Sequence, residues 1–317
     1  MTIDTALVIV QREEVADGVA AFCLAPPGGG QLPAWSPGAH VDLVLGKGMV
    51  RQYSLCGDPA DQSLWRVGVL LDPGSRGGSA HIHAHLGVGD QVHVRGPRNR
   101  FPLESAQRYV FVAGGIGITP LLPMIKEAER SGAEWVLTYG GRSRLSMAFL
   151  EELAPFGDRV KVRPQDEFGL LDLEAALGGS RADTLVYCCG PEPLLQAMTE
   201  VCSRWPAGDL HVERFGASPT VSVVDDGAGG AISVELRRTG VTVEVPGDKS
   251  ILEVVNKAGA NVMSSCEYGI CGSCETTVLD GIPDHRDDVL TARERESGKS
   301  MMLCVSRAWT DHLVLDI

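Results

Sequence analysis

Four cysteines near the end of the sequence constrain this chain more than any other feature. Cys266, Cys271 and Cys274 are spaced C-x4-C-x2-C, and Cys304 follows thirty residues after the third of them. This is the plant-type spacing of the thiolates that hold a [2Fe–2S] cluster. Two sulfide-bridged iron ions need four thiolates that converge on one point, and a tight glycine-containing loop can deliver three of them. The spacing therefore predicts a centre that carries one electron at a time.

Zinc and disulfides are the alternative uses of such cysteines. The chain holds 9 cysteines in 317 residues, which is a sparse and odd number for a disulfide framework. No basic segment followed by an apolar stretch opens the chain after Met1, so we expect a cytoplasmic protein, in which clustered cysteines more often bind metal. Zinc sites generally pair two C-x2-C units or two histidines. Since the second pair is missing, the spacing favours iron and sulfide over zinc.

The charge of the chain bears on its partners. The net charge is −13, and by count it is −2 over residues 1–104, −5 over 105–225 and −6 over 226–317. An acidic surface disfavours nucleic acid as a partner and is complementary to a basic patch on another protein. Simple solubility would explain the acidity equally well. No run of eighteen apolar residues occurs, so we expect no membrane span.

The texture of the sequence changes three times, which suits a chain of several domains. Residues 1–104 contain short β-type runs between Gly- and Pro-rich turns, which predicts an antiparallel β-barrel. Residues 105–216 alternate apolar strands with helices, as in a doubly wound α/β nucleotide-binding domain. Residues 217–230 are small and polar and read as a linker. Residues 231–317 predict a β-grasp-like α+β domain that holds the cysteines.

Two glycine-containing loops in the second of these segments are candidates for binding a dinucleotide. The first loop follows a strand and opens a helix. Its glycines would let a pyrophosphate approach the backbone closely, and the N-terminus of the helix would face the negative charge of that group. An ordinary strand-to-helix turn is the alternative. The second loop also follows a strand, and ligands of open α/β sheets bind beyond the carboxyl ends of the strands. The candidate residues are Gly114, Gly115, Gly117, Thr119 and Pro120 in the first loop, and Cys189, Gly190 and Pro191 in the second.

The end of the second strand of this segment carries arginines where the adenosine ribose lies in dinucleotide folds. Arg142 and Arg144 could bind adenosine phosphates or a 2′-phosphate, and no acidic residue occupies that strand end. A solvated basic loop is the alternative. The sequence therefore leaves both NADH and NADPH open.

The number of electrons moved at each step requires a carrier between the nicotinamide and the cluster. NADH delivers two electrons as a hydride, whereas the cluster accepts one electron at a time. A flavin can accept the pair and release the electrons singly. Candidates for the flavin site lie in the first segment. Arg51, Tyr53 and Leu55 would share one face of a strand and Ser54 the other. The run 75–79 combines an arginine, glycines and hydroxyls that suit an anion.

The motifs together resemble those of the phthalate dioxygenase reductase family, within the ferredoxin–NADP⁺ reductase superfamily, and vanillate O-demethylase reductases share the plan. The resemblance rests on the order of Arg51–Leu55, Arg76–Ser79, Gly114–Pro120, Tyr187–Pro191 and Glu213–Ala217, on the cysteine set, and on the stretches Asp284–Asp287 and Leu303–Arg307. It covers essentially the whole chain. It implies an FMN domain, a nicotinamide domain and a ferredoxin domain in that order.

The resemblance also implies roles for individual residues. FMN would be bordered by Arg51, Tyr53, Ser54 and Leu55, and its phosphate held by Arg76, Gly77, Gly78 and Ser79. Ser54 would lie near the flavin atom N5, and Phe215 would contact the flavin, which makes these two the candidate catalytic residues. Glu213 would lie close to that pocket. The implied reaction moves electrons from NADH through FMN and the cluster to a Rieske-type oxygenase.

Several alternatives stay open from the sequence. A cytochrome P450 could replace the Rieske oxygenase as the partner, or the chain could be a self-contained flavin and iron–sulfur oxidoreductase. FMN rather than FAD follows from the resemblance alone. His81, His83 and His85 form an unusual run, in which His81 and His85 would share a helical face. A surface or helix-lining role is favoured over metal binding because no carboxylate or cysteine stands nearby in the sequence.

Overall fold

The computed structural model describes residues 2–46, 49–74, 77–179, 183–205, 209–216 and 230–317. Its internal contacts divide the chain into two compact units, Met1–Phe215 and Gly216–Ile317. The first unit contains two sheets, and the second contains the four predicted cluster cysteines. Most of the predicted linker lies outside the described residues, so its conformation stays a prediction, as do the exact domain boundaries.

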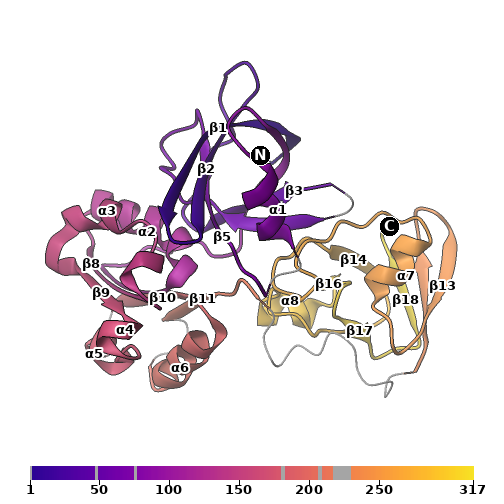
Figure 1. The fold of residues 1–317 in the computed structure, drawn as a ribbon. Coiled ribbons are helices and arrows are strands. Elements are labelled where there is room, and N and C mark those ends of the chain that lie inside the picture. The colour runs from indigo at the N-terminus through magenta and orange to yellow at the C-terminus, as the bar shows by residue number, and fades with distance from the viewer. Residues whose placement is uncertain (1, 47–48, 75–76, 180–182, 206–208, 217–229) are drawn as a thin grey trace. The chain divides into compact units, whose positions relative to one another are not determined.

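The first sheet of the N-terminal unit is an antiparallel barrel (Figure 1). Its strand order is β4-β3-β6-β1-β2-β5, and a bridge between Leu55 and Val67 joins the two ends of that order. Alternating apolar side chains fill the interior, among them Trp65, Val67 and Leu55, which are fully buried. The strands are β1 (Ile3–Ala16), β2 (Val19–Ala25), β3 (Ala39–Val44), β4 (Val50–Ser54), β5 (Trp65–Leu70) and β6 (Gln91–Asn99), with the helix α1 (Gly78–His85) between β5 and β6.

The second sheet has five parallel strands in the order β11-β10-β7-β8-β9. Since β7 pairs with β8 on one side and β10 on the other, the order reverses between β7 and β10, and such a switch point opens a crevice for a ligand. The strands are β7 (Arg108–Gly114), β8 (Glu134–Gly141), β9 (Val160–Pro164), β10 (Thr184–Cys189) and β11 (Leu210–Glu213); the helices are α2 (Ile118–Ser131), α3 (Leu150–Leu153), α4 (Gln165–Phe168), α5 (Leu173–Leu177) and α6 (Glu192–Cys202).

The barrel and the parallel sheet share one hydrophobic core. Val19 and Cys56 of the barrel pack in the same buried cluster as Phe111 of β7 and Ile118 of α2. At this junction Arg66 pairs with Glu152, and its guanidinium lies 4.9 Å from the centre of the Phe149 ring. Because the packing is shared, the barrel strands are fixed against the edge of the parallel sheet where the two candidate loops lie.

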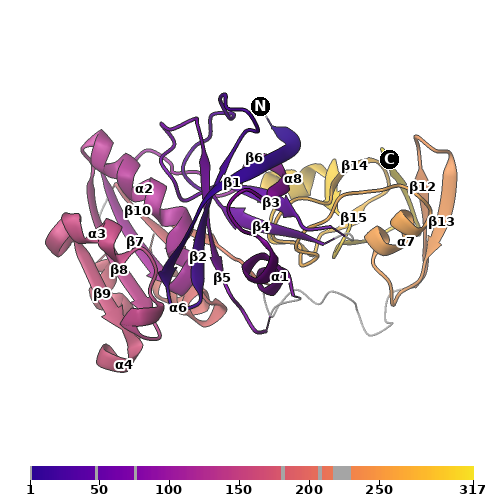
Figure 2. The same cartoon turned by 45° about the horizontal axis from the view of Figure 1, so that its top comes forward.

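The C-terminal unit is an α+β domain (Figure 2). Its five-stranded sheet has the order β13-β12-β18-β14-β16. Ser250 accepts a hydrogen bond from the amide of Glu253 and so caps α7, and Thr291 caps α8 in the same way. The elements are β12 (Ile232–Leu236), β13 (Val241–Val245), α7 (Ile251–Lys257), β14 (Glu275–Asp280), β15 (Pro283–Asp284), α8 (Ala292–Ser297), β16 (Ser300–Met302), β17 (Arg307–Ala308) and β18 (His312–Leu315).

The predicted fold class is confirmed: an antiparallel flavin-type barrel, a parallel α/β domain and a C-terminal iron–sulfur-type domain. The strands β11 and β14 were not predicted from the sequence. In the part of the chain that the structure describes, none of the helices combines the length and apolar character needed to cross a membrane.

Candidate active site and metal centre

The two candidate nucleotide loops meet at the switch point of the parallel sheet. A Cβ atom on Gly114 would lie 2.6 Å from Cδ of Pro191, and one on Gly117 would lie 2.2 Å from the carbonyl oxygen of Cys189. A Cβ on Gly190 would lie 3.0 Å from Cα of Gly114. The glycines are therefore required where the loops pack on each other. Of the five first-loop candidates, Gly115 faces open space, since a Cβ there meets nothing within 4 Å.

The start of α2 provides the environment expected for an anion. Gly115–Gly117 form a 3-10 turn that runs directly into α2, and no side chain caps the helix, so its first amides lack an acceptor from a side chain. Thr119, a candidate for binding the pyrophosphate, already uses its hydroxyl within the protein. Its hydroxyl donates to the carbonyl of Ile116 at 2.9 Å and the residue is buried, so a phosphate contact would require this hydrogen bond to be exchanged. Pro120 is also buried, within the first turn.

The carboxyl ends of β10 and β11 bring a thiol and a carboxyl group side by side. Cys189 pairs with Glu213 in the parallel register, and the side chain of Cys189 is fully buried. The hydroxyl of Ser54, at the end of barrel strand β4, lies 3.5 Å from Oε2 of Glu213. Three candidate residues from distant parts of the sequence therefore meet at one place, beside the nucleotide loops.

The protonation of Glu213 is unusual for a carboxylic acid. Burial raises the pKa of Glu213 to about 8, and the hydrogen bond with Ser54 opposes that rise. Burial also raises the pKa of Cys189 well above its ordinary value, with the neighbouring Glu213 as the next cause. Both groups are therefore neutral at pH 7, and the site presents hydroxyl, thiol and carboxylic acid groups rather than charges.

The candidate phosphate site of the flavin joins β4 to the start of α1. A Cβ atom on Gly78 would lie 2.4 Å from Nε of Arg51, which shows that the Arg51 side chain covers the N-terminus of α1. No side chain caps that helix at Gly77. The hydroxyl of Ser79 lies 3.2 Å from the amide of Asp72, which donates to it. A guanidinium and a helix N-terminus together favour a phosphate group. Arg76, the remaining candidate, lies outside the described residues.

The other candidate flavin residues divide into accessible and buried ones. Tyr53 is half-buried and burial raises the pKa of its hydroxyl. Leu55 lies on the core side of the barrel, fully buried, and its amide donates to the carbonyl of Ala39 at 2.8 Å. Leu55 therefore stabilises the barrel wall behind the candidate site. Phe215, the last residue of the N-terminal unit, is 46% exposed, which leaves its ring available to contact a ligand.

The two arginines that are candidates for binding the adenosine part of the dinucleotide differ in their contacts. Arg144 forms an ion pair with Glu167 at 3.1 Å. Arg142 is exposed, and its backbone carbonyl accepts a hydrogen bond from Asp166. A phosphate group at Arg144 would therefore compete with Glu167 for the guanidinium.

The four predicted cluster ligands come together in two pairs. Cys266 interacts with Cys271, and Cys304 with Cys274, each pair within hydrogen-bonding reach, and Cys304 also feels the charge of Cys266. Backbone amides point at the sulfur atoms: Tyr268 donates to Sγ of Cys266 at 3.3 Å and Ser273 to Sγ of Cys271 at 3.4 Å. Since each iron of a [2Fe–2S] cluster takes two thiolates, this pairing fits the cluster.

Electrostatics explains why these thiols need metal. The neighbouring thiol and then burial raise the pKa values of Cys266 and Cys304, whereas the hydrogen bond from Cys266 lowers the pKa of Cys271 to about 6. Four thiolates in a buried site would repel one another, and bound iron would neutralise them. Among the described residues, no three His, Cys, Asp or Glu side chains are grouped closely enough to hold a metal ion as they stand.

The histidine run of α1 adopts the predicted arrangement. The rings of His81 and His85 stack with centroids 4.6 Å apart on one helix face, and Nε2 of His83 lies 2.9 Å from the carbonyl of Val69. Within the described ranges these histidines have no third ligand beside them. The role of these histidines therefore stays a prediction.

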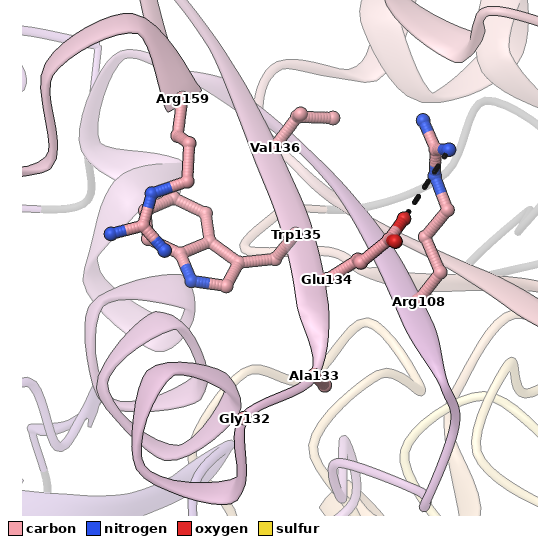
Figure 3. A pocket seen from close by; sticks show the side chains of 7 residues that line it. All are labelled: Arg108, Gly132, Ala133, Glu134, Trp135, Val136 and Arg159. Carbon is pink, nitrogen blue, oxygen red and sulfur yellow. Dashed lines mark ion pairs between the residues drawn. The ribbon is translucent and has the colours of Figure 1, made fainter.

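A separate pocket of about 370 Å³ lies at the amino ends of β7 and β8 (Figure 3). Its lining includes Arg108 and Glu134, which form an ion pair at 3.8 Å, and Arg159, whose guanidinium stacks 4.5 Å from the centre of the Trp135 ring. Since ligands of parallel sheets bind at the carboxyl ends, this pocket is not part of the nucleotide site.

Comparisons with known proteins identify the family of the chain. The family model "2Fe-2S iron-sulfur cluster binding domain" matches residues 234–308. The chain is 43% identical over 304 residues to the phenoxybenzoate dioxygenase subunit beta of Ectopseudomonas oleovorans, covering 95% of this chain and 94% of that protein. The structure of a phthalate dioxygenase reductase, described as modular for electron transfer from pyridine nucleotides to [2Fe–2S], matches with 36% identity and a TM-score of 0.73 over 99% of this chain and 98% of that one.

A second solved structure matches only in part of its length. An intact type IV self-sufficient cytochrome P450 monooxygenase shows 44% identity and a TM-score of 0.90 over 99% of this chain. The match covers 41% of that protein, so the chain spans less than half of it.

Proposed function

Because this chain belongs to the phthalate dioxygenase reductase-like family, we propose that it moves electrons from NADH through FMN and a [2Fe–2S] cluster to a terminal Rieske-type oxygenase. The chain is an NAD(P)H-dependent flavin and iron–sulfur oxidoreductase, the reductase component of an oxygenase system. The proposal adds the identity of the flavin, the preference for NADH, the residues that act and the kind of partner.

The observation that carries the proposal is the meeting of Ser54, Cys189 and Glu213 beside the switch point of the parallel sheet. A dinucleotide bound along the glycine loops would have its nicotinamide at the ends of β7 and β10, where these residues lie. Ser54 belongs to the barrel strand that also carries Arg51. The same strand can therefore orient a flavin ring at one end and hold its phosphate at the other.

The residues of the chain act by orientation and exclusion. The glycine loops would hold the pyrophosphate, and Cys189, Gly190 and Pro191 would border the nicotinamide. Arg51 and the amides at the start of α1 would hold the FMN phosphate, and Phe215 would cover the ring. Holding donor and acceptor close to reactive contact replaces a bimolecular encounter by an intramolecular one. When bound, FMN and the cluster supply the conversion of a hydride into single electrons.

The acidity of the C-terminal unit supports a basic surface on the partner. Tyr268 and Ile270 lie in the loop that carries the first cysteine pair, so we place them near the docking surface. Opposite charges would speed the encounter and align the two proteins. A cytochrome P450 is the second candidate partner, which the similarity to a self-sufficient P450 favours.

Replacing one cluster ligand tests the order of the carriers. In the Cys266→Ser variant, NADH should still reduce the flavin at close to the wild-type rate, and reduction of a one-electron acceptor protein should be lost. Cys202→Ser, which alters a buried cysteine of α6 away from both sites, is the matched control and should keep both activities. Equal loss of flavin reduction in Cys266→Ser would contradict the linear order. Titration of the reductase against a purified Rieske oxygenase and a P450 then separates the two partners.

A further inference from the structure

The buried carboxylate of Asp287 is bonded entirely within its own unit. Asp287 is 2% exposed, and its Oδ2 accepts hydrogen bonds from the amides of Val289 at 3.0 Å and Leu290 at 2.8 Å. Its Oδ1 lies 3.4 Å from the hydroxyl of Ser306, which donates to it. Nδ1 of His285 lies 3.8 Å from the same Oδ1. A buried carboxylate costs free energy unless its hydrogen bonds are satisfied, and the three donors satisfy this one.

These contacts bring three segments of the C-terminal unit together. The turn 287–290 is closed by the Asp287 carboxylate, and Ser306 belongs to the segment of the fourth cysteine. The third segment is the cysteine loop, because the amide of Asp288 donates to the carbonyl of Gly269 at 2.8 Å. Arg295 of α8 donates to the carbonyls of Asp287 and Leu290 and holds the same turn from its far side.

The carbonyl of Gly269 belongs to the peptide group whose amide is that of Ile270. A trans peptide directs its carbonyl and its N–H in opposite directions. The Ile270 amide donates to the sulfur of Cys266, and the Gly269 amide to the sulfur of Cys304. The hydrogen bond from Asp288 therefore fixes the peptide plane that aims an N–H group at a cluster ligand.

We propose that Asp287 is a positioning residue for the cluster: by closing the turn 287–290 it holds the Asp288 amide against Gly269, and so aims the Ile270 amide at the Cys266 sulfur. The inference rests on the proposed function, since it needs the [2Fe–2S] cluster to be present. Hydrogen bonds to cluster sulfurs stabilise the reduced, more negative state, so their geometry tunes the reduction potential.

Two substitutions at one position separate charge from geometry. Asp287→Asn keeps an oxygen that accepts from Val289 and Leu290 and can donate its amide to Ser306, but it removes a buried negative charge. Its cluster potential should rise. Asp287→Ala removes the same charge and opens the turn. Its cluster potential should be lower than that of Asp287→Asn, because the N–H group at Cys266 is no longer aimed.

The experiment uses the full-length holoprotein with FMN and cluster bound. We would measure the cluster potential by spectroelectrochemistry, the EPR spectrum of the reduced cluster, and the rate of iron release to a chelator. Asp287→Ala should release iron about tenfold faster or more, as expected for loss of a residue that orients metal ligands. Asp280→Asn, an exposed acid of the same unit outside this network, is the charge control and should resemble wild type on all three readouts.

Each outcome has a distinct meaning. Equal potentials, EPR spectra and iron-release rates in Asp287→Ala and Asp287→Asn would overturn the inference and leave the proposed function intact. A shift of the same size in Asp280→Asn would also overturn it, because the effect would then be general charge. Wild-type protein without iron and sulfide would overturn the proposed function, and this inference with it.

Discussion

The hydroxyl of Ser54 and the carboxyl group of Glu213 lie 3.5 Å apart, although 159 positions separate them in the sequence. One comes from the barrel and the other from the last strand of the parallel sheet. When Glu213 is neutral, its carboxylic acid group can donate a hydrogen bond to the Ser54 oxygen, which leaves the Ser54 hydroxyl free to donate to a bound ligand. When Glu213 is ionised, it would instead accept a hydrogen bond from the Ser54 hydroxyl.

The rate at which NADH reduces the flavin should therefore fall as the pH rises through about 8, the pKa of Glu213. Glu213→Gln should abolish this fall, because an amide donates to Ser54 at every pH. Ser54→Ala should move the fall to higher pH, since the hydrogen bond with Ser54 lowers the pKa of Glu213. Stopped-flow measurements between pH 6 and about 9.5 bracket this pKa. A pH profile for Glu213→Gln identical to wild type would refute the assignment.

The same raised pKa predicts a change in stability with pH. Folded Glu213 binds a proton between its ordinary pKa of 4.5 and about 8, whereas the unfolded chain does not. The free energy of unfolding should therefore fall as the pH rises through this window, with a slope of at most about 1.4 kcal/mol for each pH unit. Denaturant titrations at pH 5 and 8 should show a smaller fall for Glu213→Gln. An equal fall in both proteins would mean that the carboxyl group is ionised when folded.

Gly78→Ala should weaken flavin binding by moving Arg51. The added Cβ would lie 2.4 Å from Nε of Arg51, so the guanidinium must leave the start of α1. We expect the dissociation constant of FMN to rise about tenfold, which corresponds to about 1.4 kcal/mol. Flavin fluorescence quenching measures it. Gly87→Ala is the control, because its Cβ would make only an ordinary contact, 3.7 Å from Asp90. Unchanged affinity in Gly78→Ala would place the phosphate elsewhere.

Gly269→Ala should prevent the protein from binding its cluster. Gly269 has φ +72°, and a Cβ would lie 2.6 Å from a methyl of Val305 and 3.1 Å from Cα of Asp287. The backbone conformation alone costs about 1–2 kcal/mol for an L-residue, and the overpacking adds about 1–3 kcal/mol.

Gly298→Ala separates these two costs. It has φ +60° but its Cβ would meet nothing closer than 3.7 Å, so it carries the backbone strain alone. Iron content per chain and the melting temperature of the C-terminal unit are the measurements. Loss of iron from both variants to the same extent would show that crowding at Gly269 plays no part.

Sequence patterns predicted the elements that have strong local signals. The cysteine spacing predicted the ligand set because three ligands lie within one loop, and the alternation of apolar strands with helices in residues 105–216 predicted a parallel α/β domain. The strand β11 gave no such signal, since Leu210–Glu213 is short and half-buried along its length. Glu213 therefore entered only through the family resemblance.

Local sequence patterns could not predict which side chains from distant segments contact one another. That Asp287 would be buried between the cysteine loop and Ser306 depends on three segments whose approach is set by the hydrophobic core of the C-terminal unit. Likewise, the sequence suggested that Thr119 offers a hydroxyl to a phosphate, and only the fold shows that this hydroxyl already donates to Ile116.

Anaerobic titration of the purified holoprotein with NADH, followed by absorbance and by EPR, tests the central claim most directly. A flavin takes two electrons and the cluster one, so complete reduction should consume about 1.5 equivalents of NADH per chain and give one EPR-active cluster. Complete reduction at about one equivalent, with no EPR signal from iron, would show that the four cysteines hold no redox centre and would contradict this account.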